Sequence, residues 1–509
     1  MDDGEDLIST LPDCLLGEIV TRLPTADAVR VQVLSTRWRH IWRSCPLNLD
    51  LRSTNHRDYN RRVSSILAAH TGSGRRLKIE WPHNSGEFYN NNSWLWSPVL
   101  NGLQELEIEP GYDRNWNNTS PLPERVLFHF ASTLLILRIG YHTFPSAAAM
   151  ASLRLPHLEL ISFCCVDISE GTLHGVLAGC PVLKTLVLNS CTGFATVRIN
   201  SPTITGFAIS PADSSRTNNY SYDYDSDDHY YENPRVNQTV RLTTSQVIIE
   251  DAPLLEKLLV PCRRRSATAE SFRLLRVVSA PRLRVLGSLS SAIPKLQIGG
   301  TVFEPTTRCV NHVRPDSVII KEKRLLMQAV MLATTLRTVK ILALEDVDSV
   351  DVLTNFLKCF PCLHKLYISA SRGFRSAASY DKQNPIECLE HHLKMVALDG
   401  YEGKRTHVKF AKFFVRNARL LELMKFRIFR NYHCEPGTTK EWIADQQRQL
   451  HVRSMASRHV KFHFVHDARY YQVVYCGEDI SDLSEHIHDS SRDDPFDQWF
   501  ESEKEALAC

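Results

Sequence analysis

Two cysteines three residues apart, Cys359 and Cys362, form the spacing most suggestive of chemistry in this chain. Such a pair can hold structural zinc when two further ligands lie nearby, or exchange disulfides when it precedes a helix. No second ligand pair lies near these cysteines, and the following residues, LHKLYIS, alternate as a strand does. We therefore interpret both cysteines as small core residues and expect neither a metal site nor a cofactor.

Three other groups could carry chemistry, and each has a simpler interpretation. The HIHD segment at 486–489 could hold a metal ion weakly, but it lies in a polar region where side chains are normally solvated. The histidine pair at 391–392 precedes a strand-like segment, and the arginines at 263–265 follow a proline in a turn. The chain has no nucleophile-elbow, phosphate-loop or dinucleotide motif. We therefore predict no catalytic residues and a protein that is not an enzyme.

The composition is that of an ordinary globular protein, with 43% hydrophobic and 23% charged residues in 509. Sixty basic residues against 57 acidic ones give a formal net charge of +3, too balanced to predict nucleic-acid binding. No apolar run reaches 18 residues, so we expect no membrane span. The acidic first ten residues do not resemble a secretory signal, so we expect reduced cysteines and a cytoplasmic and/or nuclear protein.

The elements that must position these residues come from a repeat. Six segments share one pattern: proline, any residue, Leu or Ile, two residues, then Leu, Ile or Phe. They begin at Pro156, Pro181, Pro202, Pro253, Pro281 and Pro361. Successive prolines are 25, 21, 51, 28 and 80 residues apart, and three of these spacings fall within about 20–29 residues, the length of leucine-rich repeats.

Each repeat is predicted to contain one strand and one helix. The last apolar residues of a unit alternate with polar ones, which is strand spacing, and the proline suits the start of a strand. The connecting segment SEGTLHGVLAGC has helical spacing at Leu173, Val176 and Leu177, with Ser169 as a candidate N-cap. One such unit cannot bury its apolar face alone, and stacked units can. The fold class is therefore α/β.

A helix is predicted to begin at Pro12 and to end at Pro24, which cannot continue it. Its apolar residues recur every four positions: Leu11, Leu15, Ile19 and Leu23, with Leu16 beside them. Thr25 can cap a second helix, on which Val29 and Val33 share a face. Ser35 can cap a third helix, whose apolar residues are Trp38, Ile41 and Trp42.

Three short helices in about 40 residues make too small a core to bury so many apolar side chains. The surplus predicts that a protein partner covers part of this module. The alternative from spacing alone is a helical cap that protects the first repeat, as repeat arrays require.

The segment from Leu11 to Trp42 resembles the F-box of plant-type F-box/leucine-rich-repeat/FBD proteins. SEGTLHGVLAGCPVLKTLVLNSC and APRLRVLGSLSSAIPKLQIGGTVF resemble the repeats of this family, and residues 384–465 resemble its C-terminal FBD domain. Thr36 departs from the family, which commonly has a basic residue there.

The resemblance implies domains at 1–50 (F-box), 51–95 (linker and first-repeat region), 96–383 (leucine-rich repeats), 384–465 (FBD) and 466–509 (polar acidic tail). A low-complexity insertion rich in Asp, Ser, Asn and Tyr is predicted at 213–234, where aliphatic residues are absent. The implied fold is a three-helix F-box, a solenoid with one strand and one helix per repeat, and a closing FBD domain. We expect weak order in the tail.

The resemblance also implies a function: a non-catalytic substrate receptor whose F-box binds a Skp-type adaptor and, through it, a cullin–RING ubiquitin ligase. The implied adaptor face is Leu11, Pro12, Leu15, Leu16, Ile19, Leu23, Pro24, Val33, Leu34, Trp38 and Trp42. The repeats would bind a protein substrate of unknown identity. Two alternatives stay open: a scaffold that binds partners without ubiquitination, and a small-molecule receptor that uses the repeats.

Overall fold

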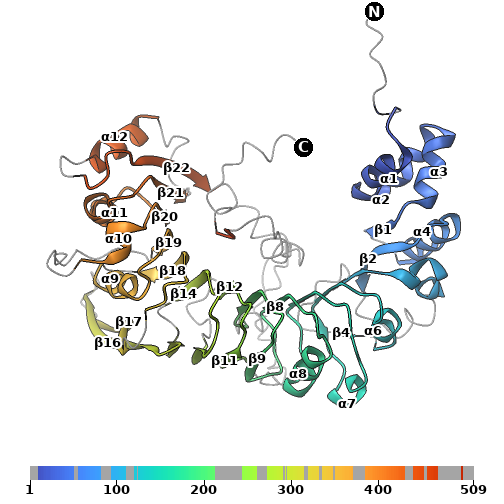
Figure 1. Ribbon diagram of the computed structural model, residues 1–509, viewed down its shortest axis with the longest axis horizontal. Coiled ribbons are helices and arrows are strands. Elements are labelled where there is room, and N and C mark those ends of the chain that lie inside the picture. Colours follow the sequence, from blue (N-terminus) through green and yellow to red (C-terminus); the bar gives the residue numbers. More distant parts are fainter. Residues whose placement is uncertain are drawn as a thin grey trace, which may run out of the picture. The chain divides into compact units, whose positions relative to one another are not determined.

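The computed structural model divides into two compact units: an N-terminal unit, Met1–Phe194 with Ser214–Thr243, and a C-terminal unit, Ala195–Asp213 with Thr244–Cys509. Figure 1 labels their helices and strands. The structure describes residues 8, 10–23, 25–50, 56–81, 93–110, 120–122, 124–212, 243–260, 272–290, 293, 295–313, 319–331, 335–347, 350–370, 385–429, 440–451, 455–467 and 494–496. The predicted insertion at 213–234 and the groups at 263–265 and 486–489 lie outside these residues.

The N-terminal unit contains a parallel sheet. Its strands run in the order β1 (Leu47–Asp50), β2 (Gly74–Trp81), β3 (Glu105–Pro110), β5 (Ile136–Gly140), β7 (Leu160–Cys164) and β8 (Thr185–Asn189). Two short strands, β4 (Ser120–Pro121) and β6 (His142–Thr143), pair separately. Parallel neighbours need a crossover between them, so each connection must return along one face of the sheet.

Helices and short 3-10 turns fill these connections. They are α4 (His56–Ala69), η2 (Ser93–Trp96), η3 (Pro98–Gly102), α6 (Glu124–Phe130), α7 (Ala147–Met150) and α8 (Glu170–Ala178). The predicted cap of α8 is confirmed, because the Ser169 hydroxyl accepts a hydrogen bond from the Thr172 N–H at 3.2 Å. Leu173 and Val176 are buried on its inner side, as helical spacing requires.

The phasing of the repeat pattern is confirmed. In all six segments the two apolar positions are at most 2% exposed, and the second lies on a strand, as Leu186 does on β8. The proline is not at the strand start, however. Pro181 lies in the turn that follows α8, and β8 begins only at Thr185. The proline thus reverses the chain before the strand, where no ladder hydrogen bond is required of it.

The residues that directly follow three neighbouring strands of the N-terminal unit share one backbone conformation. Tyr141, Cys165 and Ser190 directly follow β5, β7 and β8, and their φ angles are 56°, 53° and 53°. The Tyr141 N–H donates to the Cys164 carbonyl, and the Cys165 N–H donates to the Asn189 carbonyl, each at 2.8 Å. A left-handed residue therefore ends each of these strands, although L-residues with a Cβ disfavour that conformation.

The C-terminal unit has two sheets. The larger is parallel, in the order β10 (Gly206–Ser210), β12 (Lys257–Leu259), β14 (Val285–Ser290), β18 (Ile341–Val347), β19 (Lys365–Ala370), β20 (Met395–Asp399), β21 (Leu423–Phe429) and β22 (Lys461–Asp467). The second contains β9 (Thr196–Asn200), β11 (Gln246–Asp251), β13 (Leu274–Val277), β15 (Leu296–Ile298), β16 (Thr301–Val313) and β17 (Ile319–Met331).

The expectation of one helix per repeat is therefore wrong for the first part of this unit. The segments before β10, β12 and β14 are strands that pair with one another in parallel. Their sequences, TVRIN, QVIIED and LLRV, are short and rich in β-branched or alternating apolar residues, which favours strands over helices. These strands take the place of the expected helices, because each of them packs an apolar side against the core.

The last part of the unit returns to helices. They are α9 (Val350–Cys359), α10 (Glu387–His391), α11 (Arg405–Asn417) and α12 (Lys440–Leu450), which lie along one side of strands β18–β22 in Figure 1. Gly400 and Gly403, in the turn between β20 and α11, have positive φ angles of 78° and 69°. Helix α12 contains Trp442, and strand β22 follows it in the sequence.

Candidate functional site

Exposed apolar side chains gather in the first helices of the N-terminal unit. These helices are α1 (Asp13–Arg22), α2 (Thr25–Arg30), the 3-10 turn η1 (Val31–Val33) and α3 (Thr36–Ser44). Half of the large apolar side chains that are exposed in the described part of the chain belong to this module: Ile8, Leu15, Ile19, Val33 and Leu34. We call these five residues the apolar patch. Groups of exposed apolar side chains are typical of protein-contact surfaces.

The two sides of α1 explain how the patch arises. Leu16 and Val20 are 0% and 1% exposed and face the interior, whereas Leu15 and Ile19, one helical turn apart, are 48% and 42% exposed. A side chain at i+4 lies above the one at i, so the stripe is continuous. Val33 and Leu34, at the end of η1, are 83% and 64% exposed. Among the predicted residues, Pro12 is also exposed, and Leu11, Leu23 and Trp38 are half-buried.

Polar contacts hold the helices that carry the patch. Arg37 at the start of α3 forms an ion pair with Asp13 at the start of α1, with Nη2 and Oδ1 2.7 Å apart. The Ser35 hydroxyl caps α3 by accepting the Trp38 N–H, as predicted. Together these contacts set the crossing of α1 and α3.

Two residues of the implied adaptor face are buried in the structure. Leu16 is fully buried, and Trp42 is 2% exposed because its ring meets the edge of the His70 ring at a centroid distance of 5.2 Å. Both stabilise the module from within, so we remove them from the predicted contact face. Pro24 lies outside the described residues. Ile8 was missed by the sequence analysis, because a single exposed apolar residue before a helix has no periodic signal.

The module is joined firmly to the sheet. The Thr25 hydroxyl donates to the Asn48 carbonyl at 2.9 Å and accepts the Asp50 N–H at 2.7 Å, so it binds β1 and does not cap α2 as predicted. The His70 ring bonds the Cys45 carbonyl through Nε2 at 2.8 Å. Because β1 pairs with β2, these bonds connect the module to the first strands of the unit.

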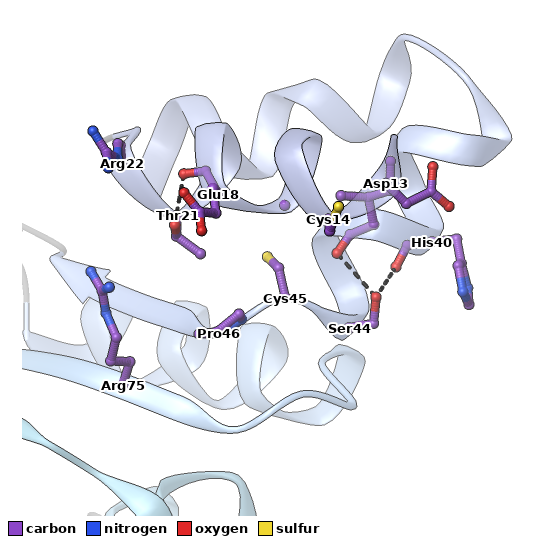
Figure 2. Close-up of a pocket in the computed structure, with 12 residues that line it drawn as sticks. Asp13, Cys14, Glu18, Thr21, Arg22, His40, Ser44, Cys45, Pro46 and Arg75 are labelled. Atoms are coloured by element: carbon purple, nitrogen blue, oxygen red, sulfur yellow. Dashed lines mark hydrogen bonds between the residues drawn. The ribbon is translucent and has the colours of Figure 1, made fainter. Parts of the chain in front are cut away.

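A polar hollow of about 620 Å³ lies on the other side of α1, and Figure 2 shows its lining. The Thr21 hydroxyl donates to the Glu18 carbonyl at 2.8 Å, and the Ser44 hydroxyl donates to the His40 carbonyl at 3.0 Å. These hydroxyls serve their own helices, and burial raises the pKa of the Cys45 thiol. The hollow is lined by residues of α1 and α3 together with Cys45, Pro46 and Arg75, so it lies between the helical module and the first strands.

Three buried thiols of the chain are unreactive. Burial raises the pKa of Cys180, Cys359 and Cys388 to about 12, so these groups are protonated near neutral pH, and only the thiolate is nucleophilic. Cys359 is buried, as its interpretation as a core residue requires, and Cys362 is half-buried. Within the described residues, no three or more His, Cys, Asp or Glu side chains are grouped as metal ligands. No helix in the described part of the chain could cross a membrane.

A buried charge cluster lies on β2 and β3, and the sequence analysis missed it. Glu107 Oε2 is 2.9 Å from Arg76 Nη2, and Glu107 Oε1 is 3.1 Å from Lys78 Nζ. Lys78 also pairs with Glu109 at 2.9 Å. Lys78 and Glu107 are only 3% and 1% exposed. Alternating charges on neighbouring strands were the available signal, but register was needed to show that they pair.

The fold defines a class: a repeat protein that carries a helical N-terminal module with exposed apolar side chains. The family described as FBD-associated F-box protein At5g56370, LRR repeats, matches residues 91–218 and 232–368, more than half of the chain. The F-box domain matches residues 8–50, and the FBD domain matches residues 381–426. The chain belongs to the F-box/LRR-repeat/FBD family.

Relatives in Arabidopsis thaliana share the same organisation. F-box/FBD/LRR-repeat protein At1g51370 is 32% identical over 191 residues, which are 36% of this chain and 41% of the relative. F-box/FBD/LRR-repeat protein At2g04230 is 30% identical over 224 residues, 40% of this chain and 48% of the relative. The chain thus spans less than half the length of these curated relatives. F-box/LRR proteins are generally non-catalytic substrate adaptors of Skp–cullin–F-box ligases.

Proposed function

We propose that this protein is the substrate-recognition subunit of a Skp–cullin–F-box ubiquitin ligase, acting in the cytoplasm and/or nucleus. The N-terminal module docks on a Skp-type adaptor, which connects it to a cullin–RING ligase, and the repeats stack as a solenoid that binds a protein substrate. The observation that carries this proposal is the apolar patch on a module that matches the F-box domain.

The patch has the composition of an interface core. Leu15, Ile19, Val33 and Leu34 are 48%, 42%, 83% and 64% exposed, so burying their remaining surface contributes roughly 4–7 kcal/mol in total, at about 1.5–3 kcal/mol for each fully buried side chain. Association costs several kcal/mol, and a micromolar complex needs about 8 kcal/mol of net binding energy, so the helices' half-buried apolar neighbours must contribute as well. Leu11, Leu23 and Trp38 are those neighbours. A few central residues should dominate the affinity.

The chain itself need not perform chemistry in this role. Holding a substrate close to a charged conjugating enzyme raises the effective concentration of the substrate lysine, which is a positioning effect.

Recovery of a Skp-type adaptor tests the docking face. We expect Leu15→Asp together with Ile19→Asp to abolish adaptor recovery, because buried unpaired carboxylates are costly. A matched control carries Val182→Asp and Leu420→Asp, two apolar residues that are 38% and 45% exposed outside the patch. The control should recover the adaptor as wild type does.

Equal recovery by wild type and the patch variant would refute the docking face. Failure of the wild-type chain to recover any adaptor would refute the ligase role itself. A scaffold without ligase activity is distinguished by a substrate that binds but gains no ubiquitin in the reconstituted complex.

A further inference from the structure

Three residues near the end of the chain, Asp494–Phe496, lie against strand β19 in the C-terminal unit. Asp494 Oδ2 accepts a hydrogen bond from Lys365 Nζ at 2.6 Å and another from the Tyr367 hydroxyl at 2.8 Å. Its Oδ1 accepts the Phe496 N–H at 3.2 Å. The ring centroids of Phe496 and Tyr367 are 5.3 Å apart. The expectation of weak order in the tail is wrong for these three residues, because each is buried.

These contacts are made on the sheet face that does not bear the apolar core row. Leu366 aligns with Leu342 on β18 and with Val396 on β20, and all three are fully buried. Side chains alternate along a strand, so Lys365 and Tyr367 point the other way. Helices α9–α11 lie along one side of these strands (Figure 1), and we assign the core row to that side.

Small residues surround the contact. Tyr367 aligns with Ala343 on β18 and Ala397 on β20, so only methyl groups flank its ring on the two adjacent strands. An aromatic side chain can therefore approach the Tyr367 ring closely. Ring pairs at this distance contribute beyond simple area burial.

The charge pattern of this face favours an acidic ligand. Arg427 on β21 is neutralised by Asp399, with Nε and Oδ1 2.6 Å apart. Lys365 is a further cation on the same face, and it pairs with Asp494. A carboxylate that is only 9% exposed, as Asp494 is, would be costly to bury without such donors. The two hydrogen bonds that Lys365 and Tyr367 donate to it show a built donor site, more specific than apolar packing alone.

We propose that Lys365 and Tyr367 form a recognition site for a protein segment that makes a tight turn and has a carboxylate two residues before an aromatic side chain. Asp494–Phe496 is the internal occupant of this site, and a substrate segment with the same pattern binds by displacing it. The identity of the ligand as a ubiquitination substrate rests on the proposed function, whereas the site rests on the contacts above.

An internal occupant weakens binding of an external one by a calculable factor. A tethered segment has an effective concentration on the order of 1 mM, so a site with an intrinsic Kd of about 100 µM is weakened roughly tenfold. Removing the internal occupant should therefore raise the affinity for an external segment about tenfold.

A labelled peptide with the sequence of residues 490–500, SSRDDPFDQWF, tests the site by fluorescence anisotropy on the full chain. The released variant Asp494→Asn with Phe496→Ala should bind the peptide about tenfold more tightly than wild type does. Adding Lys365→Met to the released variant should weaken binding at least about tenfold, through loss of a charge-assisted hydrogen bond. A peptide with the same two substitutions should not bind the released variant.

Lys394→Met in the released variant is the matched control, because Lys394 is an exposed lysine directly before β20 whose ion pair with Glu422 is at the surface. It should leave the affinity unchanged. Asp494→Asn alone, which keeps the buried ring, provides a milder released variant if the double variant melts at a lower temperature. Equal affinity of wild type and both released variants would overturn internal occupancy, and no binding by any released variant at millimolar peptide would overturn the site.

The two proposals fail independently. Peptide binding without adaptor recovery would leave the recognition site standing and refute the ligase role. Adaptor recovery without peptide binding would leave the ligase role standing and refute the recognition site.

Discussion

Glu107 shows how one buried carboxylate can hold two strands. It lies between Arg76 and Lys78, and although burial acts to raise its pKa, the two cations more than offset this and lower it. Removing one partner of a buried pair is expected to cost about 3–5 kcal/mol, because the remaining charge is buried without compensation. Glu107→Gln should therefore lower the free energy of unfolding by that order.

Chemical denaturation of Glu107→Gln and Glu159→Gln checks this prediction. Glu159 pairs with Lys184 at 2.8 Å, but both side chains are about half exposed, and exposed pairs contribute at most about 1 kcal/mol. Similar losses in both variants would show that the charge cluster on β2 and β3 is not structurally important.

His70 gives the N-terminal module a pH dependence. Burial lowers its pKa, while its hydrogen bond to the Cys45 carbonyl acts in the opposite direction. The unfolded imidazole titrates near pH 6.5, so below that pH the unfolded chain takes up a proton that the folded chain resists. Stability contributed by neutral His70 is thus present above about pH 6.5 and falls as the pH drops below it.

The measurement is unfolding of wild type and His70→Gln between pH 7.5 and 5.5, followed through tryptophan fluorescence, to which Trp42 contributes beside this ring. The wild-type chain should lose more stability on acidification than the variant. Parallel pH profiles would mean that His70 is not the group responsible.

At the scale of single residues, sequence patterns identified helix caps better than contacts between residues far apart in the sequence. Ser35 and Ser169 cap helices as expected, since a cap acts within four residues of itself. Thr25 and Trp42 were misassigned because their partners, Asn48 and His70, are 23 and 28 residues away in the sequence. Local spacing does not contain that information.

The repeat strand is the element whose energetics can be tested most directly. Leu186 on β8 is 0% exposed and lies in register with Ile161 on β7. Leu186→Ala should destabilise the N-terminal unit by about 2–5 kcal/mol, because it removes buried methyl groups and leaves a void. Val182→Ala, at a 38% exposed position in the same repeat, should cost much less.

Thermal and denaturant midpoints of the two variants measure the difference. Comparable shifts would indicate that the core does not follow the repeat phase.

Element types were predictable wherever spacing was unambiguous. The helices over α1, α3, α8 and α11 and the repeat strands follow directly from periods of about 3.6 and 2 residues. The strands β9, β11 and β13 were not expected, because the helical spacing of the α8 segment was extended to every repeat. The short segments TVRIN, QVIIED and LLRV favour strands, and their pairing with one another confirms this.

At the scale of the whole molecule, the two proposed binding surfaces belong to different compact units. Changes at distant sites without shared partners are usually additive. Leu15→Asp with Ile19→Asp should therefore not alter the affinity of the released variant for the 490–500 peptide. Conversely, Lys365→Met should leave adaptor recovery at the wild-type level.

Combining both changes in one chain and measuring both activities tests this independence. A loss of peptide affinity on changing the apolar patch would show that the units are energetically coupled.

The family and the order of its domains could be predicted from the sequence, whereas the position of Asp494–Phe496 could not. That segment has no periodicity, and its partners Lys365 and Tyr367 are more than 120 residues earlier in the chain. The exposed stripe of α1 was predictable in outline, but which residues turn inward depended on what α3 and His70 cover.

Only Cys45 and Pro46 separate the end of α3 from β1, and β1 is a strand of the sheet. A connection this short has no slack. A protein that binds the module therefore also fixes the orientation of the first strands of the N-terminal unit, because no flexible linker lies between α3 and β1. Under the proposed function, an adaptor bound to the module would therefore be held in one orientation to β1 and β2, and lengthening the connection at Cys45–Pro46 would lower ubiquitination without lowering adaptor affinity.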